Sequence, residues 1–173
     1  MRASSVEIHI ESPIGTYVLG ASDAGLCRVA LAEVSAAESA PSAGAPARTR
    51  AHTHAAAGAR ALRAYFAGES DAFDALALDP HGSDFERSVW AALREIPYGS
   101  TESYGALARR IGRPGAARAV GQANHRNPLG IVVPCHRVIG ADGSLTGYAS
   151  GTNRKRWLLE HESRPEGTAR SEP

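Results

Sequence analysis

The sequence has few cysteines, no long apolar run and almost no net charge. Its two cysteines lie far apart and form no Cys-x-x-Cys pair, which argues against a disulfide framework and for a reducing compartment. No apolar run approaches the length of a membrane span, so we expect no membrane association. The formal net charge of +1 excludes a global field that attracts polyanions, so any nucleic-acid binding must come from local clusters. Since no secretory leader is recognisable, we expect a cytoplasmic protein.

The N-terminal third predicts a small antiparallel β-sheet. Residues 6–10 alternate apolar and polar side chains, residues 12–15 (Ser-Pro-Ile-Gly) are typical of a turn, and residues 16–21 resume the strand pattern. Residues 26–31 predict a third strand, in which Cys27 has no neighbouring base or metal-ligand spacing and is expected to be ordinary packing. With 43% hydrophobic residues, the chain is able to bury a core of its own.

A segment rich in Ala, Ser, Pro and Gly follows the third strand. Residues 35–59 predict a flexible loop, followed by a short helix at residues 59–67 and an extended piece at residues 73–78. His52 and His54 lie in the predicted loop with no cysteine or carboxylate nearby. We therefore expect them to face solvent, and we expect no metal site.

The next part of the chain predicts three helices. Ser-Asp-Phe-Glu at residues 83–86 is a capping box that marks a helix start, and Pro-Tyr-Gly at residues 97–99 marks its end. Apolar residues recur at helical spacing between them and predict a buried face. A second helix at residues 104–111, a Gly-containing turn at residues 112–115 and a third helix at residues 116–124 form a helix-turn-helix outline.

The third predicted helix is built of small residues around one long cation, Arg118. Its sequence at residues 116–121, Ala-Ala-Arg-Ala-Val-Gly, lets the backbone lie very close to whatever it faces. It has too few polar side chains to read the major groove of DNA, which favours shape-based contact with the minor groove and insertion of Arg118 into the base stack. Alternatively, the alanines permit close helix packing within the protein, and the residues alone leave both interpretations open.

The candidate nucleophile lies in the stretch from residue 127 to residue 138. Cys135 ends an apolar run and directly precedes His136. A thiol attacks well near neutral pH only when something removes its proton, so a neighbouring base favours nucleophilic chemistry. The alternative is an inert cysteine packed in the core.

The C-terminal end predicts a hairpin, a helix and a tail. Residues 139–148 predict a β-hairpin or wing that turns at residues 140–143. Residues 153–161 predict a last short helix, and Glu162 at its end is by itself typical of a surface carboxylate. The polar residues 163–173 predict a disordered tail.

Taken together, these motifs resemble those of the O6-alkylguanine-DNA alkyltransferases, also called methylated-DNA-protein-cysteine methyltransferases. The resemblance rests on Pro-Cys-His-Arg-Val at residues 134–138, the small-residue helix at 116–121, Ser103-Tyr104, Asn127-Pro128 and Trp-Leu-Leu-Glu-His-Glu at 157–162. It implies an α+β fold with a small, β-rich, ribonuclease H-like domain at residues 1–80. A C-terminal helical domain with a winged helix-turn-helix, at residues 83–162, carries the reactive thiol.

The resemblance also implies a reaction. An alkyl group moves from O6 of a damaged guanine in double-stranded DNA to the sulfur of Cys135, after the nucleotide has been flipped out of the duplex. Glu162 orients and charges the imidazole of His136, which draws the thiol proton through a water. Asn127 braces the turn around the site. Tyr104 donates a proton to the guanine as O6 leaves and crowds the phosphate on the 3′ side.

Further residues are assigned by the same resemblance. Those expected to contact DNA are Tyr104, Arg113, Ala117, Arg118, Ala119, Gly121 and Ala141. Those expected to line the base pocket are Val138, Tyr148, Ala149 and Ser150. Ala149 stands where some relatives have a hydroxyl or a larger residue, so the tolerated size of the alkyl group stays open. The N-terminal region lacks the Cys and His set that holds zinc in some relatives, so we expect no metal. We also expect no cofactor and a monomer, and whether copies cluster cooperatively on DNA stays open.

The product of such a transfer is a thioether, which has no acyl carbon for water to attack, so each molecule is expected to act once. Three other functions compete with this hypothesis. A non-catalytic lesion-binding relative would lack the acceptor cysteine, so the presence of Cys135 argues against it. A cysteine hydrolase would turn over repeatedly, and a winged-helix transcription factor would not need Cys135.

Overall fold

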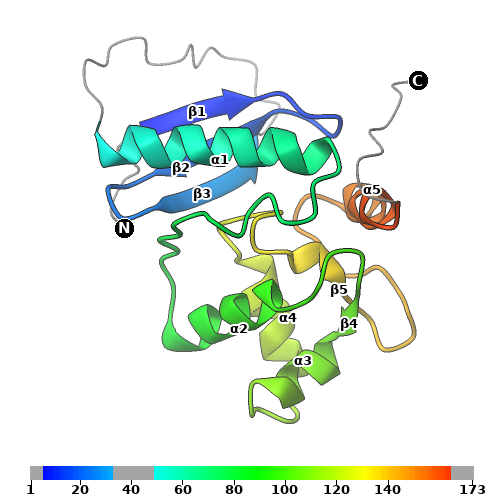
Figure 1. The fold of residues 1–173 in the computed structure, drawn as a ribbon. Coiled ribbons are helices and arrows are strands. Elements are labelled where there is room, and N and C mark those ends of the chain that lie inside the picture. The colour runs from blue at the N-terminus through cyan, green and yellow to red at the C-terminus, as the bar shows by residue number, and fades with distance from the viewer. Residues whose placement is uncertain (1–5, 33–48, 165–173) are drawn as a thin grey trace.

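The N-terminal part is a three-stranded antiparallel sheet with one helix packed across it (Figure 1). In the computed structural model, which describes residues 6–32 and 49–164, the strands are β1 (Val6–Ile10), β2 (Tyr17–Ala21) and β3 (Leu26–Leu31), in that order. Leu19 of β2 pairs with Ile8 on one side and Val29 on the other, so these apolar side chains share one face of the sheet. The three predicted strands are confirmed.

Helix α1 (Arg50–Phe66) packs against this apolar face. A Cβ atom at Gly58 would lie 2.8 Å from the Cδ1 atom of Leu26 and 3.1 Å from the Cδ2 atom of Leu19. The missing side chain therefore allows the close approach of α1 to β2 and β3.

The flexible loop predicted for residues 35–59 is wrong over residues 50–59, which form the first half of α1. Residues 33–48 lie outside the described part of the chain. The side chain of Thr49 caps the helix by accepting a hydrogen bond from the backbone N–H of His52, at 3.3 Å. Alanine has the highest helix propensity, and buried alanines recur along α1 at helical spacing, so a composition that suggested a loop forms a helix.

The extended piece predicted for residues 73–78 is also wrong over residues 73–75, which lie in turns. Asp74 N–H donates to the carbonyl of Asp71, and Leu76 N–H donates to the carbonyl of Phe73, so this segment forms consecutive turns. Only Leu78 is paired, through a single parallel bridge with Leu26.

The C-terminal part is built around the helices α2 (Asp84–Arg94), α3 (Tyr104–Arg110), α4 (Ala117–His125) and α5 (Thr152–Glu162). All four correspond to predicted helices, with small differences at their ends. The capping box is present, since Ser83 Oγ accepts from Glu86 N–H and the Glu86 carboxylate accepts from Ser83 N–H. The Trp90 indole N–H donates to the carbonyl of Ala123 at 2.8 Å and so joins α2 to α4.

The hairpin predicted for residues 139–148 is not formed. Strand β5 (Val138–Ile139) pairs in parallel with β4 (Glu102–Ser103), and residues 140–151 contain no strand. The buried ammonium group of Lys155 donates to the carbonyls of Val138, at 2.5 Å, and Thr146, at 2.9 Å. A side chain therefore satisfies backbone groups that a second strand would have paired.

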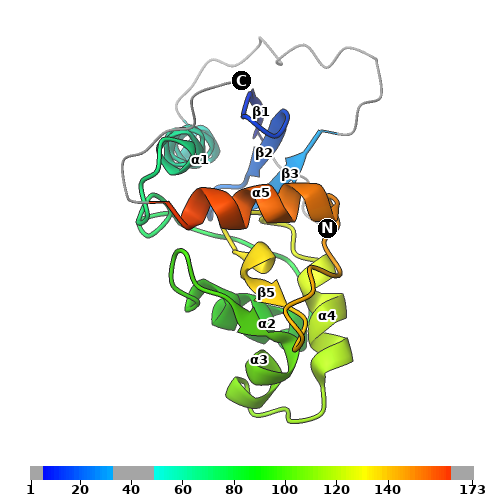
Figure 2. The same ribbon diagram turned by 90° about the vertical axis from the view of Figure 1, so that its right-hand side faces the viewer.

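Helix α5 lies between the sheet with α1 and the group of α2 to α4 (Figure 2). Arg154 Nε donates to the carbonyl of Ile14 at 3.1 Å, and His161 Nε2 donates to the carbonyl of Tyr65 at 2.8 Å. Both ends of α5 are thus attached to the N-terminal part. Of the predicted tail, residues 165–173 lie outside the described residues. Within the described ranges, no helix combines the length and the apolar character that crossing a membrane requires.

We expect Ser83→Ala to lower the free energy of unfolding by about 1 kcal/mol, because it removes the N-cap of α2. Chemical denaturation of both proteins measures the difference. Ser88→Ala is the matched control, since Ser88 is exposed and lies within the same helix. An equal loss in both variants would contradict the role of the cap.

Candidate functional site

The segment that carries Cys135 is a tightly braced loop. The Asn127 amide donates to the carbonyl of Val133 at 2.8 Å, and its Oδ1 atom accepts from Leu129 N–H at 3.0 Å. Ile131 has a φ of 67°, a left-handed conformation that is rare for a β-branched residue. The loop then enters the 3-10 turn η1 (Cys135–Arg137), so Cys135 and His136 lie on a helical turn and not on a strand.

The thiol of Cys135 adjoins a small cavity. Cys135 is 6% exposed, and the cavity has a volume of about 100 Å³. Its lining comes from β2 and β3, from the region of α4 and the Cys135 loop, and from the segment before α5: Tyr17, Val29, Ala30, Leu31, Asn124, His125, Asn127, Gly130, Cys135, Tyr148, Ala149 and Ser150. The N-terminal sheet therefore supplies one wall of the cavity.

Burial raises the pKa of the Cys135 thiol, while a hydrogen bond from the Asn127 side chain and the charge of Lys155 oppose this effect. The net result is a thiol that is protonated at neutral pH. Nucleophilic attack by this sulfur therefore requires a base that takes the proton.

His136 and Glu162 form a buried pair. His136 Nε2 donates to Glu162 Oε1 at 2.6 Å, and both side chains are 0% exposed. Because Nε2 carries the proton, Nδ1 is the acceptor nitrogen, and it has no hydrogen-bond partner among the described residues. A buried acceptor without a partner is a natural position for a water.

Glu162 accepts further hydrogen bonds on both of its oxygens. Tyr65 Oη donates to Oε1 at 2.8 Å, Arg137 donates through Nε to Oε2 at 2.8 Å and through Nη2 to Oε1 at 3.1 Å, and Gly99 N–H donates to Oε2 at 3.2 Å. Burial by itself would raise the pKa of Glu162, but His136 and Arg137 outweigh it and hold the pKa well below its usual range. Glu162 is therefore ionised at neutral pH.

Tyr104 stands at the start of α3 beside an open groove. Its hydroxyl donates to the carbonyl of Thr146 at 3.0 Å, and burial raises its pKa, as does neighbouring Cys135. The groove has a volume of about 660 Å³ and follows α4, with a lining of Tyr104, Ala117, Arg118, Gly121, Gln122, His125, Arg126, Thr146 and Gly147. His125 lines both the groove and the Cys135 cavity, so the two adjoin.

The structure brings most of the predicted site residues together. Asn127 and Cys135 line the cavity together with Tyr148, Ala149 and Ser150, and His136, next to Cys135 in the chain, is bonded to Glu162. Tyr104, Ala117, Arg118 and Gly121 line the groove. His136 and Glu162 lie behind the cavity lining, and four other predicted residues also lie outside both linings. Arg113, Ala119 and Ala141 are exposed, and Val138 is buried, with its carbonyl bonded to Lys155.

The pattern of the sequence alone did not identify Tyr17, Tyr65 or Lys155 as parts of this site. Tyr65 had the signal of a core residue on a helix, and Tyr17 that of a strand residue. Lys155 lay in a basic run, where a solvated cation is the ordinary expectation. These residues contact parts of the chain that lie apart from them in the sequence. The local spacing of residues does not reveal such contacts.

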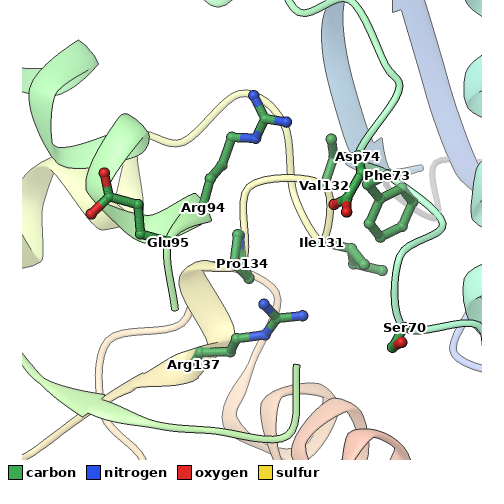
Figure 3. A pocket seen from close by; sticks show the side chains of 9 residues that line it. All are labelled: Ser70, Phe73, Asp74, Arg94, Glu95, Ile131, Val132, Pro134 and Arg137. Carbon is green, nitrogen blue, oxygen red and sulfur yellow. The ribbon is translucent and has the colours of Figure 1, made fainter. Parts of the chain in front are cut away.

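A second pocket lies against the same loop (Figure 3). It has a volume of about 220 Å³ and is lined by Ser70, Phe73, Asp74, Arg94, Glu95, Ile131, Val132, Pro134 and Arg137. Arg137 thus borders this pocket while its guanidinium is bonded to Glu162. Within the described residues, no group of three or more His, Cys, Asp or Glu is arranged to hold a metal ion.

We expect Glu162→Gln to lower the free energy of unfolding by about 3–5 kcal/mol at pH 7, because Arg137 loses the anion that it is buried against. A lowered pKa stabilises the fold above the pKa of the unfolded state, near 4.3 for Glu, and this contribution is lost as the pH falls below that value. The difference between the two proteins should therefore shrink under acid conditions, as measured by denaturation from pH 7 to pH 3. Glu69→Gln, at an exposed position, is the control and should show no such trend.

Comparison with known proteins identifies the family of the chain. Residues 84–164 match the family described as the 6-O-methylguanine DNA methyltransferase, DNA binding domain. The crystal structure of Mycobacterium tuberculosis OGT in complex with DNA is similar over 90% of this chain and 91% of that one, with a TM-score of 0.73 and 46% identity.

Two relatives bear the name methylated-DNA-protein-cysteine methyltransferase. The protein of Methanosarcina acetivorans is 61% identical over 103 residues, which are 60% of this chain and 65% of that relative, slightly less than two thirds of its length. The protein of Mycolicibacterium paratuberculosis is 50% identical over 158 residues, which are 90% of each chain. The chain therefore belongs to the methylated-DNA-protein-cysteine methyltransferase family.

Proposed function

We propose that this protein repairs DNA by transferring an alkyl group, such as methyl, from O6 of a guanine to the sulfur of Cys135. The observation that carries the proposal is the position of the thiol, which adjoins a cavity that meets a groove along α4 and is followed in the chain by a buried His136–Glu162 pair. A nucleophile, a base and an adjoining space are the parts that such a transfer needs.

The proton of the thiol leaves through His136. Its Nδ1 atom is the free acceptor of the ring, and a water next to it carries the proton from Cys135. Glu162, which stays ionised, stabilises the imidazolium that forms. The sulfur then forms a bond to the alkyl carbon while the bond from that carbon to O6 breaks.

The leaving guanine needs one proton. Burial raises the pKa of the Tyr104 hydroxyl, so this group is protonated at neutral pH and is able to donate. It donates now to the carbonyl of Thr146, a bond that the base replaces. The thiol proton, held by His136, restores Tyr104 afterwards, so that the net transfer is one proton from sulfur to guanine.

The flipped base occupies the junction of the groove and the cavity, with O6 directed at Cys135. The cavity itself has a volume of about 100 Å³, which suits the alkyl group and the edge of the base more than a whole purine. Tyr17, Val29 and Leu31 form its wall on the side of the N-terminal sheet and limit the room for the alkyl group.

DNA binds along α3, the turn at residues 112–115 and α4. These elements contact the minor groove of the DNA. Ala117 and Gly121 on the groove side of α4 allow its backbone to approach closely, and Arg118 is exposed and fills the space that the flipped base leaves. The similar Mycobacterium tuberculosis OGT crystallised with DNA, which supports the choice of partner. Helices α3 and α4 and the segment of residues 140–151 have the arrangement of a winged helix-turn-helix. The sheet covered by α1 has the arrangement of a ribonuclease H-like fold.

The transfer consumes the protein, because the product is a thioether. Water finds no acyl carbon to attack, and no good leaving group is present. This separates the proposed activity from that of a cysteine hydrolase. A lesion-binding protein without transfer would not need the buried His136–Glu162 pair beside an available sulfur.

Incubation with a duplex containing O6-methylguanine should add one methyl group to the peptide that contains Cys135, as detected by mass spectrometry. Methyl transfer should stop at one equivalent per protein molecule. We expect Cys135→Ala to abolish transfer and to retain DNA binding, while Cys27→Ala, on β3, retains both. Binding without a change in mass would support a lesion-binding protein, and repeated turnover would support a hydrolase.

Arg118→Ala should slow transfer from a paired duplex at least tenfold, since an empty base stack costs a few kcal/mol, of which Arg118 recovers a part. Transfer from the free alkylated base should change little. The rates on the two substrates are compared with those of Arg63→Ala, an exposed cation on α1 outside the groove. Equal losses on both substrates would contradict the role of Arg118.

A further inference from the structure

We infer that Tyr65, in helix α1 of the N-terminal part, is a positioning residue of the transfer reaction, because its hydroxyl limits the charge that Glu162 presents to His136. The inference rests on the proposed function and adds to it a contribution from the N-terminal sheet and helix. Tyr65 touches no reacting atom and acts only through Glu162.

The hydroxyl of Tyr65 competes with His136 for a single oxygen atom. Tyr65 Oη lies 2.8 Å and His136 Nε2 lies 2.6 Å from Oε1 of Glu162, and Arg137 Nη2 approaches the same atom at 3.1 Å. Each donor draws on the electron density of one carboxylate oxygen. The bond from Tyr65 therefore weakens the stabilisation that Glu162 gives to a protonated His136.

Tyr65 is fixed in this position on all sides. It is 1% exposed, and its ring stacks on Phe73 with centroids 5.1 Å apart and meets the edge of Phe66 at 5.3 Å. Its backbone carbonyl accepts a hydrogen bond from His161, the residue next to Glu162. The side chain and the backbone of Tyr65 are thus both attached to the end of α5, and the hydroxyl has no room to turn away.

The Tyr65 hydroxyl also stays protonated, and so remains a hydrogen-bond donor, across the pH range of the reaction. Burial raises the pKa of Tyr65 well above its usual value, and neighbouring Glu162 raises it further, so the phenol stays neutral and protonated. Unlike Arg137, it adds no net charge. The titratable and charged groups that act on Tyr65 or Glu162 are Tyr98 after α2, His136 and Arg137 of η1 and Tyr148 before α5. His161 of α5 binds the backbone carbonyl of Tyr65.

The test is the pH dependence of methyl transfer by the full chain to a duplex with O6-methylguanine. Removing the hydroxyl in Tyr65→Phe leaves more of the Glu162 charge for His136, so Glu162 stabilises the imidazolium more strongly. The acid limb of the pH–rate profile should move to higher pH by on the order of 0.5 unit. A limb that stays in place or moves to lower pH would overturn the inference.

Phe66→Leu is the matched packing control. It loosens the ring contact at Tyr65 and leaves the hydroxyl in place, so it should reduce rates at every pH without moving the limb. The methyl groups taken up at saturation give the active fraction of each protein. If the wild-type protein transfers no methyl group, the proposed function fails. If the wild-type protein transfers methyl groups and the pH–rate profile of Tyr65→Phe coincides with the wild-type profile, only the inference about Tyr65 fails.

Discussion

The carboxylate of Glu162 is the interaction on which the site depends. An ionised carboxylate without exposure is stable only when donors surround it, and here His136, Arg137, Tyr65 and Gly99 supply them. These donors belong to three separate segments of the chain, and Glu162 belongs to a fourth. One buried charge therefore fixes the His136 ring, holds the last turn of α5 and joins the N-terminal helix α1 to the C-terminal part.

The same charge explains a local feature of the backbone. Gly99 has a φ of 72°, and a Cβ atom at this position would lie 2.8 Å from the carbonyl oxygen of Glu162. Only glycine lets the turn after α2 come close enough for its N–H to reach the carboxylate. In the sequence, Pro-Tyr-Gly at residues 97–99 indicated only the end of a helix, whereas the structure shows that this turn also contributes to the site.

Much of the fold was predictable, because strands β1 to β3 and helices α2 to α5 carry local signals of alternation, capping and helical spacing. Cys135 and His136 were recognisable as neighbours, and the resemblance assigned Glu162 to them against the ordinary interpretation of a surface carboxylate. The bond from Tyr65 to Glu162 was not predictable, since the two residues are 97 positions apart and only the packed fold brings them together. The first half of α1 was missed because its alanines are equally compatible with a loop by composition.

Lys155 both takes the place of the hairpin pairing and acts on the Cys135 thiol. Its buried ammonium group replaces a strand partner by binding the carbonyls of Val138 and Thr146, and so fixes the segment that leads into Tyr148. Burial lowers the pKa of Lys155, while the charge of Lys155 lowers the pKa of the Cys135 thiol against the effect of burial. A regular hairpin in its place would satisfy the same carbonyls without a cation. Tyr148 of the irregular segment therefore lines the cavity, and Lys155 of α5 lowers the pKa of the thiol beside it.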